Sequence, residues 1–334
     1  MRLIFILLLF PYFTFPQQTV SDSIVHNNVT RHFTTYIPAV YNSSIPVPLL
    51  FNLHGRTSNA WQQMWYGDFR GIADTANFII VHPQGLLDNT GVTHWNIGQS
   101  AIDDLGFIEV LYQKLITEYN IDLDKVYSAG MSNGGYMSYY LACDMSDKFA
   151  AIASVTGAMS SYTQLICNPV HPTPVMEIHG TADFTVPFND IVSGLEYWRD
   201  YNNCDVLPDT IIIPDIVLTD FSTIEHIVYN NGDNGVTTEL FKVINGGHSW
   251  PGTSFPAGVT NYDINASIEI WKFFSRYDIN GLIGTAAIPN QQITNKKELI
   301  KIVDILGRET KLKKNTSLFY IYSDGTVEKK IFVE

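Results

Sequence analysis

The feature that most constrains this chain is the run Gly130-Met131-Ser132-Asn133-Gly134, a Gly-x-Ser-x-Gly pattern between two segments of different character. Residues 126–130 favour a β-strand, and residues 136–143 are compatible with a helix. A serine at the apex of a sharp strand-to-helix turn is held in a strained backbone conformation that needs glycines nearby. Chance matches to the pattern are common, but few of them fall between a strand and a helix. We therefore interpret the run as a nucleophile elbow with Ser132 as the nucleophile.

A serine hydroxyl is a weak nucleophile and needs a histidine base with an orienting carboxylate. The loop after the predicted strand 175–178 contains Asp183, and the loop after the predicted strand 237–243 contains His248. We predict that both join Ser132 in the chain order serine, aspartate, histidine. Asp183 has an alternative as a turn residue, and His248 has one as a structural histidine. Asp190 is a weaker rival for the carboxylate, because capping explains an acid at a helix start.

A second set of predicted site residues surrounds this triad. The apolar strand 49–53 ends at a glycine turn, where the backbone N–H of Arg56, with that of Asn133, is predicted to form an oxyanion hole. The neighbouring His54 is more readily explained as a structural histidine bonded to backbone. Three aromatic residues adjacent to these loops are predicted to line an apolar substrate pocket, with burial in the core as the alternative: Trp95, Phe184 and Trp250.

Strand-like and helix-like segments alternate along most of the chain. Apolar runs at 78–81 and 150–155 are typical of strands buried on both faces. Helical spacing follows Asp103-Asp104, whose acids suit a first turn, and a further amphipathic helix is predicted at 266–274. The sequence thus predicts an α/β fold with a mostly parallel sheet covered by helices on both faces.

The composition excludes several function classes. The 334 residues have a formal net charge of −13, which argues against a nucleic acid partner. The chain has no H-E-x-x-H, C-x-x-C or Walker-type motif, so we predict neither a metal nor a cofactor.

The first residues are typical of a signal peptide. Arg2 precedes the apolar run 3–10, which is too short to span a bilayer. We predict a signal peptide over residues 1–18, a secreted protein and no stable membrane insertion. In an oxidising compartment, Cys143 and Cys167 are close enough along the chain to form a disulfide, which leaves Cys204 free.

The predicted domains follow from a change in composition near residue 281. We assign a catalytic domain to residues 19–281, a linker to 282–295 and a small β-rich module to 296–334.

Six motifs that recur in order carry a resemblance to a known family. They are Leu53-His54-Gly55, Trp95-Asn96, Asp103-Asp104-Leu105-Gly106-Phe107, Gly130-Met131-Ser132-Asn133-Gly134-Gly135, His179-Gly180-Thr181-Ala182-Asp183 and Gly247-His248-Ser249-Trp250-Pro251-Gly252. Over residues 30–276 the chain resembles secreted poly(3-hydroxybutyrate) depolymerases and feruloyl or acetyl-xylan esterases. The resemblance implies the α/β-hydrolase fold, a serine-esterase mechanism and the triad named above.

The chain departs from this family at two places. The family often has cysteines after the loop tryptophan, where this chain has Asn96-Ile97. It also often pairs a cysteine at the position of Cys204 with a downstream partner that is missing here. Both differences concern the pocket wall, so substrate choice stays open.

The final residues resemble a C-terminal sorting tail of the type IX secretion system. Residues 301–309 and 322–330 carry this resemblance. It implies export by the type IX machinery and a product that is extracellular or attached to the cell surface. Without the resemblance, the tail is interpreted as a small binding module.

Together these patterns predict a secreted serine carboxylic-ester hydrolase that forms an acyl-enzyme, acting on feruloyl or acetyl esters of plant polysaccharides. The alternatives are a polyester depolymerase, for example of poly(3-hydroxybutyrate), a serine peptidase of the same fold, and a non-catalytic surface-binding protein.

Overall fold

The structure is a computed structural model, and it describes residues 17–98, 100–284, 299–304, 308–311, 317–322 and 327–331. The chain forms two compact units, Met1–Thr285 and Ala286–Glu334, which are described separately. Most of the predicted signal peptide and most of the predicted linker lie outside the described residues, so both assignments remain predictions.

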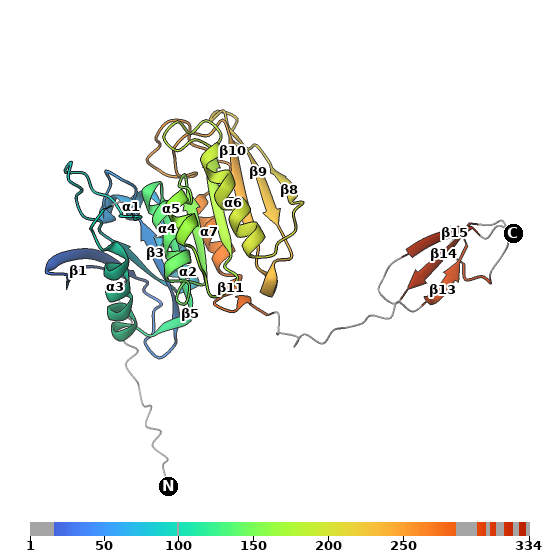
Figure 1. Ribbon diagram of the computed structural model, residues 1–334, viewed down its shortest axis with the longest axis horizontal. Coiled ribbons are helices and arrows are strands. Elements are labelled where there is room, and N and C mark those ends of the chain that lie inside the picture. Colours follow the sequence, from blue (N-terminus) through green and yellow to red (C-terminus); the bar gives the residue numbers. More distant parts are fainter. Residues whose placement is uncertain are drawn as a thin grey trace, which may run out of the picture. The chain divides into compact units, whose positions relative to one another are not determined.

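A ten-stranded sheet forms the centre of the first unit, in the order β1-β2-β4-β3-β5-β6-β7-β10-β9-β8 (Figure 1). Neighbouring strands from β4 to β10 run parallel, and the pairs at both edges run antiparallel. The strands are β1 Gln18–His26, β2 Val29–Ile37, β3 Val47–Leu53, β4 Ile79–Pro83, β5 Ile121–Met131, β6 Ala151–Val155, β7 Val175–Gly180, β8 Asp209–Ile213, β9 Thr223–Tyr229 and β10 Thr238–Ile244.

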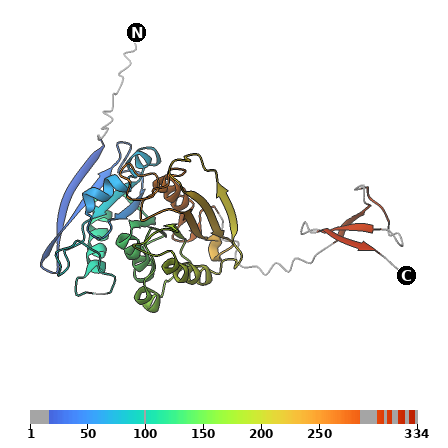
Figure 2. The same cartoon turned by 90° about the horizontal axis from the view of Figure 1, so that it is seen from above.

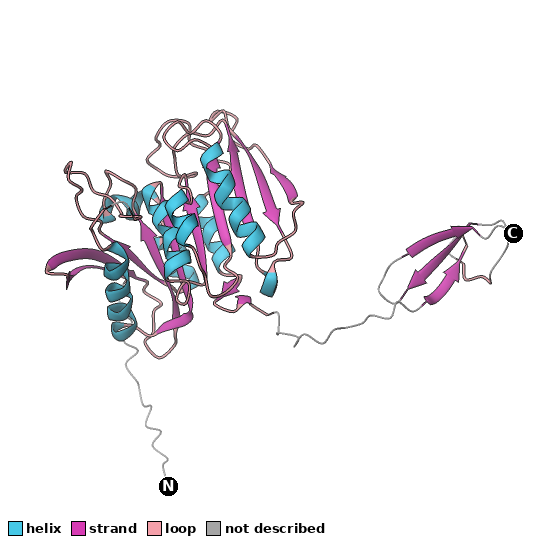
Figure 3. Ribbon diagram, in the orientation of Figure 1, coloured by secondary structure: helices cyan, strands magenta, loops and turns pink. Residues whose placement is uncertain are grey.

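Helices cover both faces of this sheet (Figures 2 and 3). Apolar residues of α3, α4 and α6 pack on one face, and those of α2 and α7 pack on the other. The helices are α1 Ala60–Tyr66, α2 Arg70–Ala76, α3 Asp104–Glu118, α4 Asn133–Asp144, α5 Ser161–Ile166, α6 Asn189–Tyr201 and α7 Ala266–Phe274. The predicted fold class, a mostly parallel sheet covered on both faces, is confirmed.

The central strands are mostly apolar because both of their faces are covered. All five residues of β6 are buried, as are all six of β7. Two pairs of stacked rings lie between α7 and the sheet. The ring centroids of Trp271 and Phe78 are 3.8 Å apart, and those of Phe274 and Tyr127 are 4.8 Å apart. This packing anchors α7 to strand β5 and to the start of β4.

Several elements were not predicted from the sequence. The helices α1, α2 and α5 are six or seven residues long, too short for a clear apolar period. Strand β8 was not predicted either, and all but one of its residues are exposed at the sheet edge. Its sequence, Asp209-Thr210-Ile211-Ile212-Ile213, lacks the alternation of apolar and polar residues that is typical of a half-buried strand.

The described part of the second unit is a three-stranded antiparallel sheet. It consists of β13 Leu299–Val303, β14 Ser317–Tyr322 and β15 Val327–Ile331. This agrees with the predicted small β-rich module. A separate two-stranded ribbon, β11 Tyr277–Asp278 with β12 Gly281–Leu282, ends the first unit. Among the helices of the described residues, none has the length and apolarity needed to cross a bilayer.

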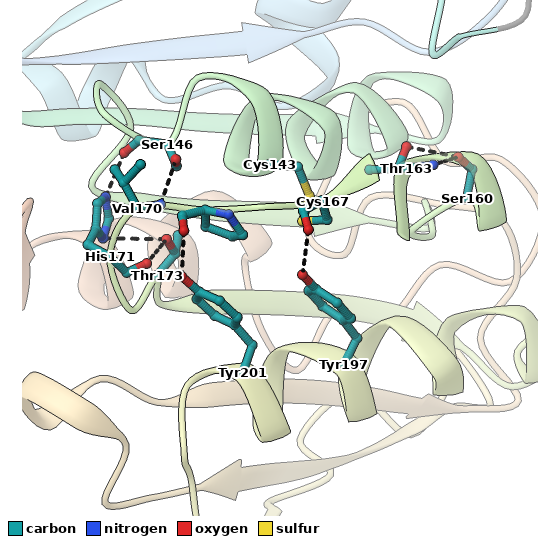
Figure 4. Close-up of a disulfide and its surroundings, with 11 residues drawn as sticks. Cys143, Ser146, Ser160, Thr163, Cys167, Val170, His171, Thr173, Tyr197 and Tyr201 are labelled. Atoms are coloured by element: carbon teal, nitrogen blue, oxygen red, sulfur yellow. Dashed lines mark hydrogen bonds between the residues drawn. A yellow bond between two sulfur atoms is a disulfide. The ribbon is translucent and has the colours of Figure 1, made fainter. Parts of the chain in front are cut away.

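A disulfide joins the end of α4 to the end of α5, as predicted. Cys143 lies in the last turn of α4, and Cys167 follows directly after α5 (Figure 4). The hydroxyl of Tyr197 on α6 donates a hydrogen bond to the Cys167 carbonyl at 3.3 Å. Cys204 is a free, buried thiol.

Candidate active site

The predicted elbow is present between β5 and α4. Ser132 has a φ of 52° and a ψ of −118° and stands immediately before the first residue of α4. A side chain at Gly130 would lie 2.3 Å from the Gly134 carbonyl, and one at Gly134 would lie 2.2 Å from the Leu53 carbonyl oxygen. Both glycines are therefore required by close backbone approaches, and they leave the serine at the apex of the turn.

The two predicted partner loops meet in space. The Nδ1 atom of His248 lies 2.7 Å from Oδ2 of Asp183. The other oxygen of this carboxylate accepts hydrogen bonds from the backbone N–H groups of Thr185 at 2.8 Å and Val186 at 2.9 Å. Since Nδ1–H donates to the carboxylate, the Nε2 atom of His248 carries the lone pair that a general base needs.

Asp183 is suited to stay ionised in this setting. Its side chain is buried, and burial alone would raise its pKa. The hydrogen bond from His248 and the N–H of Val186 outweigh burial, so the pKa of Asp183 lies below its ordinary value. An ionised carboxylate at this place holds the imidazole in one tautomer and stabilises its protonated form.

Backbone hydrogen bonds hold these two loops side by side. Ala182 donates its N–H to the Gly246 carbonyl at 2.9 Å, and Thr181 donates to the Val243 carbonyl at 2.8 Å. A side chain at Gly180 would lie 2.2 Å from the Gly246 carbonyl oxygen, so only glycine permits this approach. The order of the loops at the sheet edge thus follows from β10 lying beside β7.

Ser132 and His248 line one cavity of about 560 Å³. The same cavity is bordered by Gly55 and Arg56, and a side chain at Gly55 would lie 3.5 Å from the Ser132 Cβ. Asn133 is the first residue of α4, where backbone N–H groups have no partner within the helix. Arg56 thus borders the cavity that contains Ser132, and Asn133 follows the serine directly in the chain; their role as an oxyanion hole stays a prediction.

Two further motif residues, Trp95 and His54, form a buried hydrogen-bond network next to Asn133. Trp95 donates its indole N–H to the His54 carbonyl at 2.9 Å and its backbone N–H to the Asn133 side chain at 2.6 Å. His54 is itself buried, accepts the N–H of Gly85 at 2.9 Å, and has a pKa lowered to about 4 by burial. The structural interpretation of His54 fits these contacts.

The acidic pair at the start of α3 is only partly explained by the helix dipole. Asp103 caps the helix by accepting the Gly106 N–H at 2.9 Å. Asp104 is buried, pairs with Arg31 at 2.5 Å and accepts the Asn96 N–H at 2.7 Å. It therefore also holds the loop that carries Trp95.

The three predicted pocket aromatics lie outside the lining of the cavity that contains Ser132 and His248. Trp95 and Trp250 are each 1% exposed. Burial is possible because both indole N–H groups have internal acceptors, the His54 carbonyl for Trp95 and the Ser267 hydroxyl for Trp250. Phe184 is 94% exposed, and none of the three borders the cavity. Trp250 borders a neighbouring hollow of about 650 Å³, so a role of the three aromatic residues in substrate binding stays a prediction. The aromatic wall consists instead of Trp61, Trp65 and Tyr66 from α1 together with Phe255.

The wall residues were missed because the short helix α1 was missed. Trp61 and Trp65 are four residues apart, 57% and 41% exposed, with ring centroids 6.0 Å apart. Tyr66 also holds the histidine loop, since its hydroxyl accepts the backbone N–H of Trp250 at 3.2 Å and lies 3.3 Å from the Ser249 hydroxyl. Exposed tryptophans at helical spacing were the only available signal for this wall.

Within the described residues, no group of three or more histidine, cysteine, aspartate or glutamate side chains is arranged to hold a metal ion.

Sheet order, elbow and loop arrangement define a protein of the α/β-hydrolase fold. A family model described as phospholipase/carboxylesterase matches residues 103–228, which include Ser132 and Asp183. An acetyl xylan esterase from Aspergillus awamori has a similar structure, with a TM-score of 0.57, 14% identity, and coverage of 77% of this chain and 99% of that one. At this identity the likeness concerns the fold.

Curated relatives are similar in sequence as well. A bifunctional acetylxylan esterase/xylanase from Neocallimastix patriciarum is 27% identical over 80% of this chain and 36% of its own length. Feruloyl esterase C from Emericella nidulans is 29% identical over 66% of this chain and 82% of its own. The chain thus spans about a third of the first relative and most of the second. These similarities support an esterase of the α/β-hydrolase fold.

Proposed function

We propose that this protein is a serine carboxylic-ester hydrolase that works through an acyl-enzyme on feruloyl or acetyl esters of plant polysaccharides. One observation carries the proposal: a serine at a strained elbow shares a cavity with a histidine whose Nδ1 is held at 2.7 Å by a buried carboxylate. This is the arrangement that acyl transfer requires.

The proposed reaction has two halves. The Nε2 atom of His248 takes the Ser132 proton while Oγ attacks the ester carbonyl, and the resulting oxyanion is stabilised by the N–H groups of Asn133 and Arg56. His248 then gives its proton to the departing alcohol, which leaves an acyl group on the serine. Water, deprotonated by the same histidine, attacks this acyl group and restores the free serine.

The cavity wall supports an aromatic or sugar-bearing ester. Two exposed tryptophans, Trp61 and Trp65, offer flat apolar faces near the nucleophile. A neighbouring hollow of about 650 Å³ shares Trp65, Tyr66 and Phe255 with the cavity. A surface that continues past the scissile ester suits a substrate longer than a simple acetate. The names of the relatives, which are acetylxylan and feruloyl esterases, agree with this choice.

The proposal is tested by hydrolysis of three substrates, each beside Ser132→Ala. They are methyl ferulate, acetylated xylan and a poly(3-hydroxybutyrate) film, with 4-nitrophenyl acetate as a reactive control. Ferulate or xylan deacetylation that is lost in the variant supports the proposal. Film clearing alone would favour a polyester depolymerase instead, and cleavage of peptide amides without ester turnover would favour a peptidase. No turnover at all, with retained binding of polysaccharide, would indicate a non-catalytic binding protein.

The proposal extends to the place of action. The Cys143–Cys167 disulfide suits an oxidising compartment outside the cytosol. The three-stranded sheet of the second unit lies where the resemblance to a type IX sorting tail falls. We therefore infer a secreted enzyme, released or surface-attached, whose second unit serves export. Fractionation of cells that express the chain with and without residues 296–334 tests this inference.

A further inference from the structure

A second buried carboxylate and imidazole lie directly behind the catalytic aspartate. Glu177 and His179 are neighbours on one face of β7, and both are fully buried. The Nδ1 atom of His179 lies 3.0 Å from Oε1 of Glu177. The other ring nitrogen donates to the Val186 carbonyl at 2.8 Å and lies 3.5 Å from Oδ2 of Asp183. The serine mechanism described above makes no use of this pair.

The contacts around the pair favour a proton on the histidine. Both ring nitrogens of His179 face acceptor oxygens, and an imidazole with two such partners is best satisfied as an imidazolium. The hydroxyl of Tyr139 donates to Oε2 of Glu177 at 3.1 Å, which stabilises the carboxylate. Burial would lower the pKa of His179, but the hydrogen bond and charge of Glu177 and the Val186 carbonyl raise it. Burial also raises the pKa of Glu177, so the buried pair retains one proton, which we assign to His179.

Other charged groups near the pair are already accounted for. Lys242 stands opposite His179 in the register of β10, but it pairs with Glu225 at 2.9 Å. On the helix side, Tyr136 of α4 packs nearby and Asp190 of α6 is exposed. The imidazolium of His179 is therefore the cation that lies next to the catalytic carboxylate, besides His248 itself.

We propose that Glu177 is a positioning residue of this site: it holds His179 as an imidazolium beside Asp183, and this cation keeps His248 a neutral base to lower pH. The physical reason is that a cation near Asp183 offsets part of the negative field that would otherwise stabilise protonated His248. The Val186 carbonyl contact also fixes the turn whose N–H groups hold Asp183. Only the predicted effect on ester turnover rests on the proposed function; the effect on the titration of His248 does not.

The direct test is a titration of the histidine side chains by NMR in the full chain, with His248 assigned by the signal lost in His248→Asn. In Glu177→Gln the amide can donate to Nδ1 of His179, so the ring contacts survive while the imidazolium loses its counter-ion. The negative charge of Asp183 is then no longer offset by a neighbouring cation. We therefore expect the titration midpoint of His248 to rise by about half a pH unit or more. His179 should change from two ring N–H signals at neutral pH to one.

A matched control comes from the same sheet. Glu239 of β10 is also buried and lies 2.8 Å from Nε2 of His226, away from the catalytic loops. Glu239→Gln should leave the His248 midpoint unchanged even if the protein is less stable. If Glu177→Gln does not fold, Tyr139→Phe, which removes one donor to Glu177, should raise the midpoint by a smaller amount.

The outcomes are separable from those for the proposed function. Where ester turnover is present, the acid limb of kcat/KM should move to higher pH in Glu177→Gln by the same amount as the His248 midpoint. An unchanged midpoint in this variant, or an equal shift in Glu239→Gln, overturns the inference. Absence of ester turnover would contradict the proposed function while leaving the NMR titration readable.

Discussion

His248 and Asp183 are 65 positions apart in the chain, yet Nδ1 of the first lies 2.7 Å from Oδ2 of the second. The contact exists because β10 pairs in parallel with β7, so that the loops after both strands leave the sheet at the same edge. Since parallel strands present their carboxyl ends together, residues after successive strands can form one site.

Replacing Asp183 by asparagine should lower kcat by roughly 10³–10⁴-fold, because the amide no longer fixes the imidazole tautomer or stabilises its protonated form. Steady-state kinetics with a 4-nitrophenyl ester measures this. Asp190→Asn is the control, since Asp190 is exposed in the first turn of α6 and should change kcat less than about twofold. A larger loss in Asp190→Asn than in Asp183→Asn would mean that the carboxylate is misassigned.

Replacing Trp61 or Trp65 by alanine should raise KM for methyl ferulate and feruloylated xylan by roughly 10-fold, through loss of an aromatic contact worth about 1 kcal/mol or more. Turnover of 4-nitrophenyl acetate should change little, because its acyl group reaches only the nucleophile. Phe184→Ala provides the comparison, since this ring is exposed but does not border the cavity. Equal effects of Phe184→Ala and Trp65→Ala on KM would contradict the assigned wall.

The contrast between these aromatic residues indicates what the sequence could predict. The positions of Ser132, Asp183 and His248 could be predicted because each residue lies just past a predicted strand. Whether Trp95 and Trp250 point into the core or into the cavity could not be predicted. Their orientation depends on acceptors such as the His54 carbonyl and the Ser267 hydroxyl. Most of the aromatic side chains that border the cavity come from α1, a seven-residue helix whose placement depends on tertiary contacts.

The Glu177 and His179 pair illustrates a similar limit. The alternation of β7 places the two side chains on one face, but an apolar run containing two polar residues does not reveal what they contact. Only the turn after the strand, which returns the Val186 carbonyl to His179, brings the pair next to Asp183. A buried polar pair inside a core strand was the available signal.

Stability should decrease as the pH falls from about 6.5 to 4, in part because of His54. Its pKa in the folded protein is about 4 against an ordinary value of 6.5, so the unfolded chain binds a proton in this window while the folded chain does not. This difference amounts to roughly 3 kcal/mol in the free energy of unfolding at the acid end. Urea unfolding at several pH values measures it.

The matched variants for this prediction are His54→Gln and His32→Gln. The first should flatten the decline, while the second, at an exposed position on β2, should leave it unchanged. A curve for His54→Gln that is parallel to the wild-type curve would show that His54 does not contribute.

Loss of the Cys143–Cys167 disulfide should lower the free energy of unfolding by about 3 kcal/mol, because the bond closes a loop between residues 24 positions apart. Thermal unfolding of Cys143→Ser/Cys167→Ser measures this loss, and activity at 25 °C should persist because neither residue borders the cavity. Cys204→Ser, which removes a buried thiol but no crosslink, should cost less. Identical unfolding midpoints with and without the disulfide would contradict the expectation.

The most direct measurement is to find the residue that an organophosphate inhibitor modifies. After incubation of the folded protein with diisopropyl fluorophosphate, peptide mass spectrometry should find one adduct per chain, on Ser132, together with loss of ester hydrolysis. Ser132→Ala should take up no label, and His248→Ala should take it up far more slowly. Stoichiometric labelling of another residue, or ester hydrolysis that persists in Ser132→Ala, would contradict the assignment of this serine as the nucleophile.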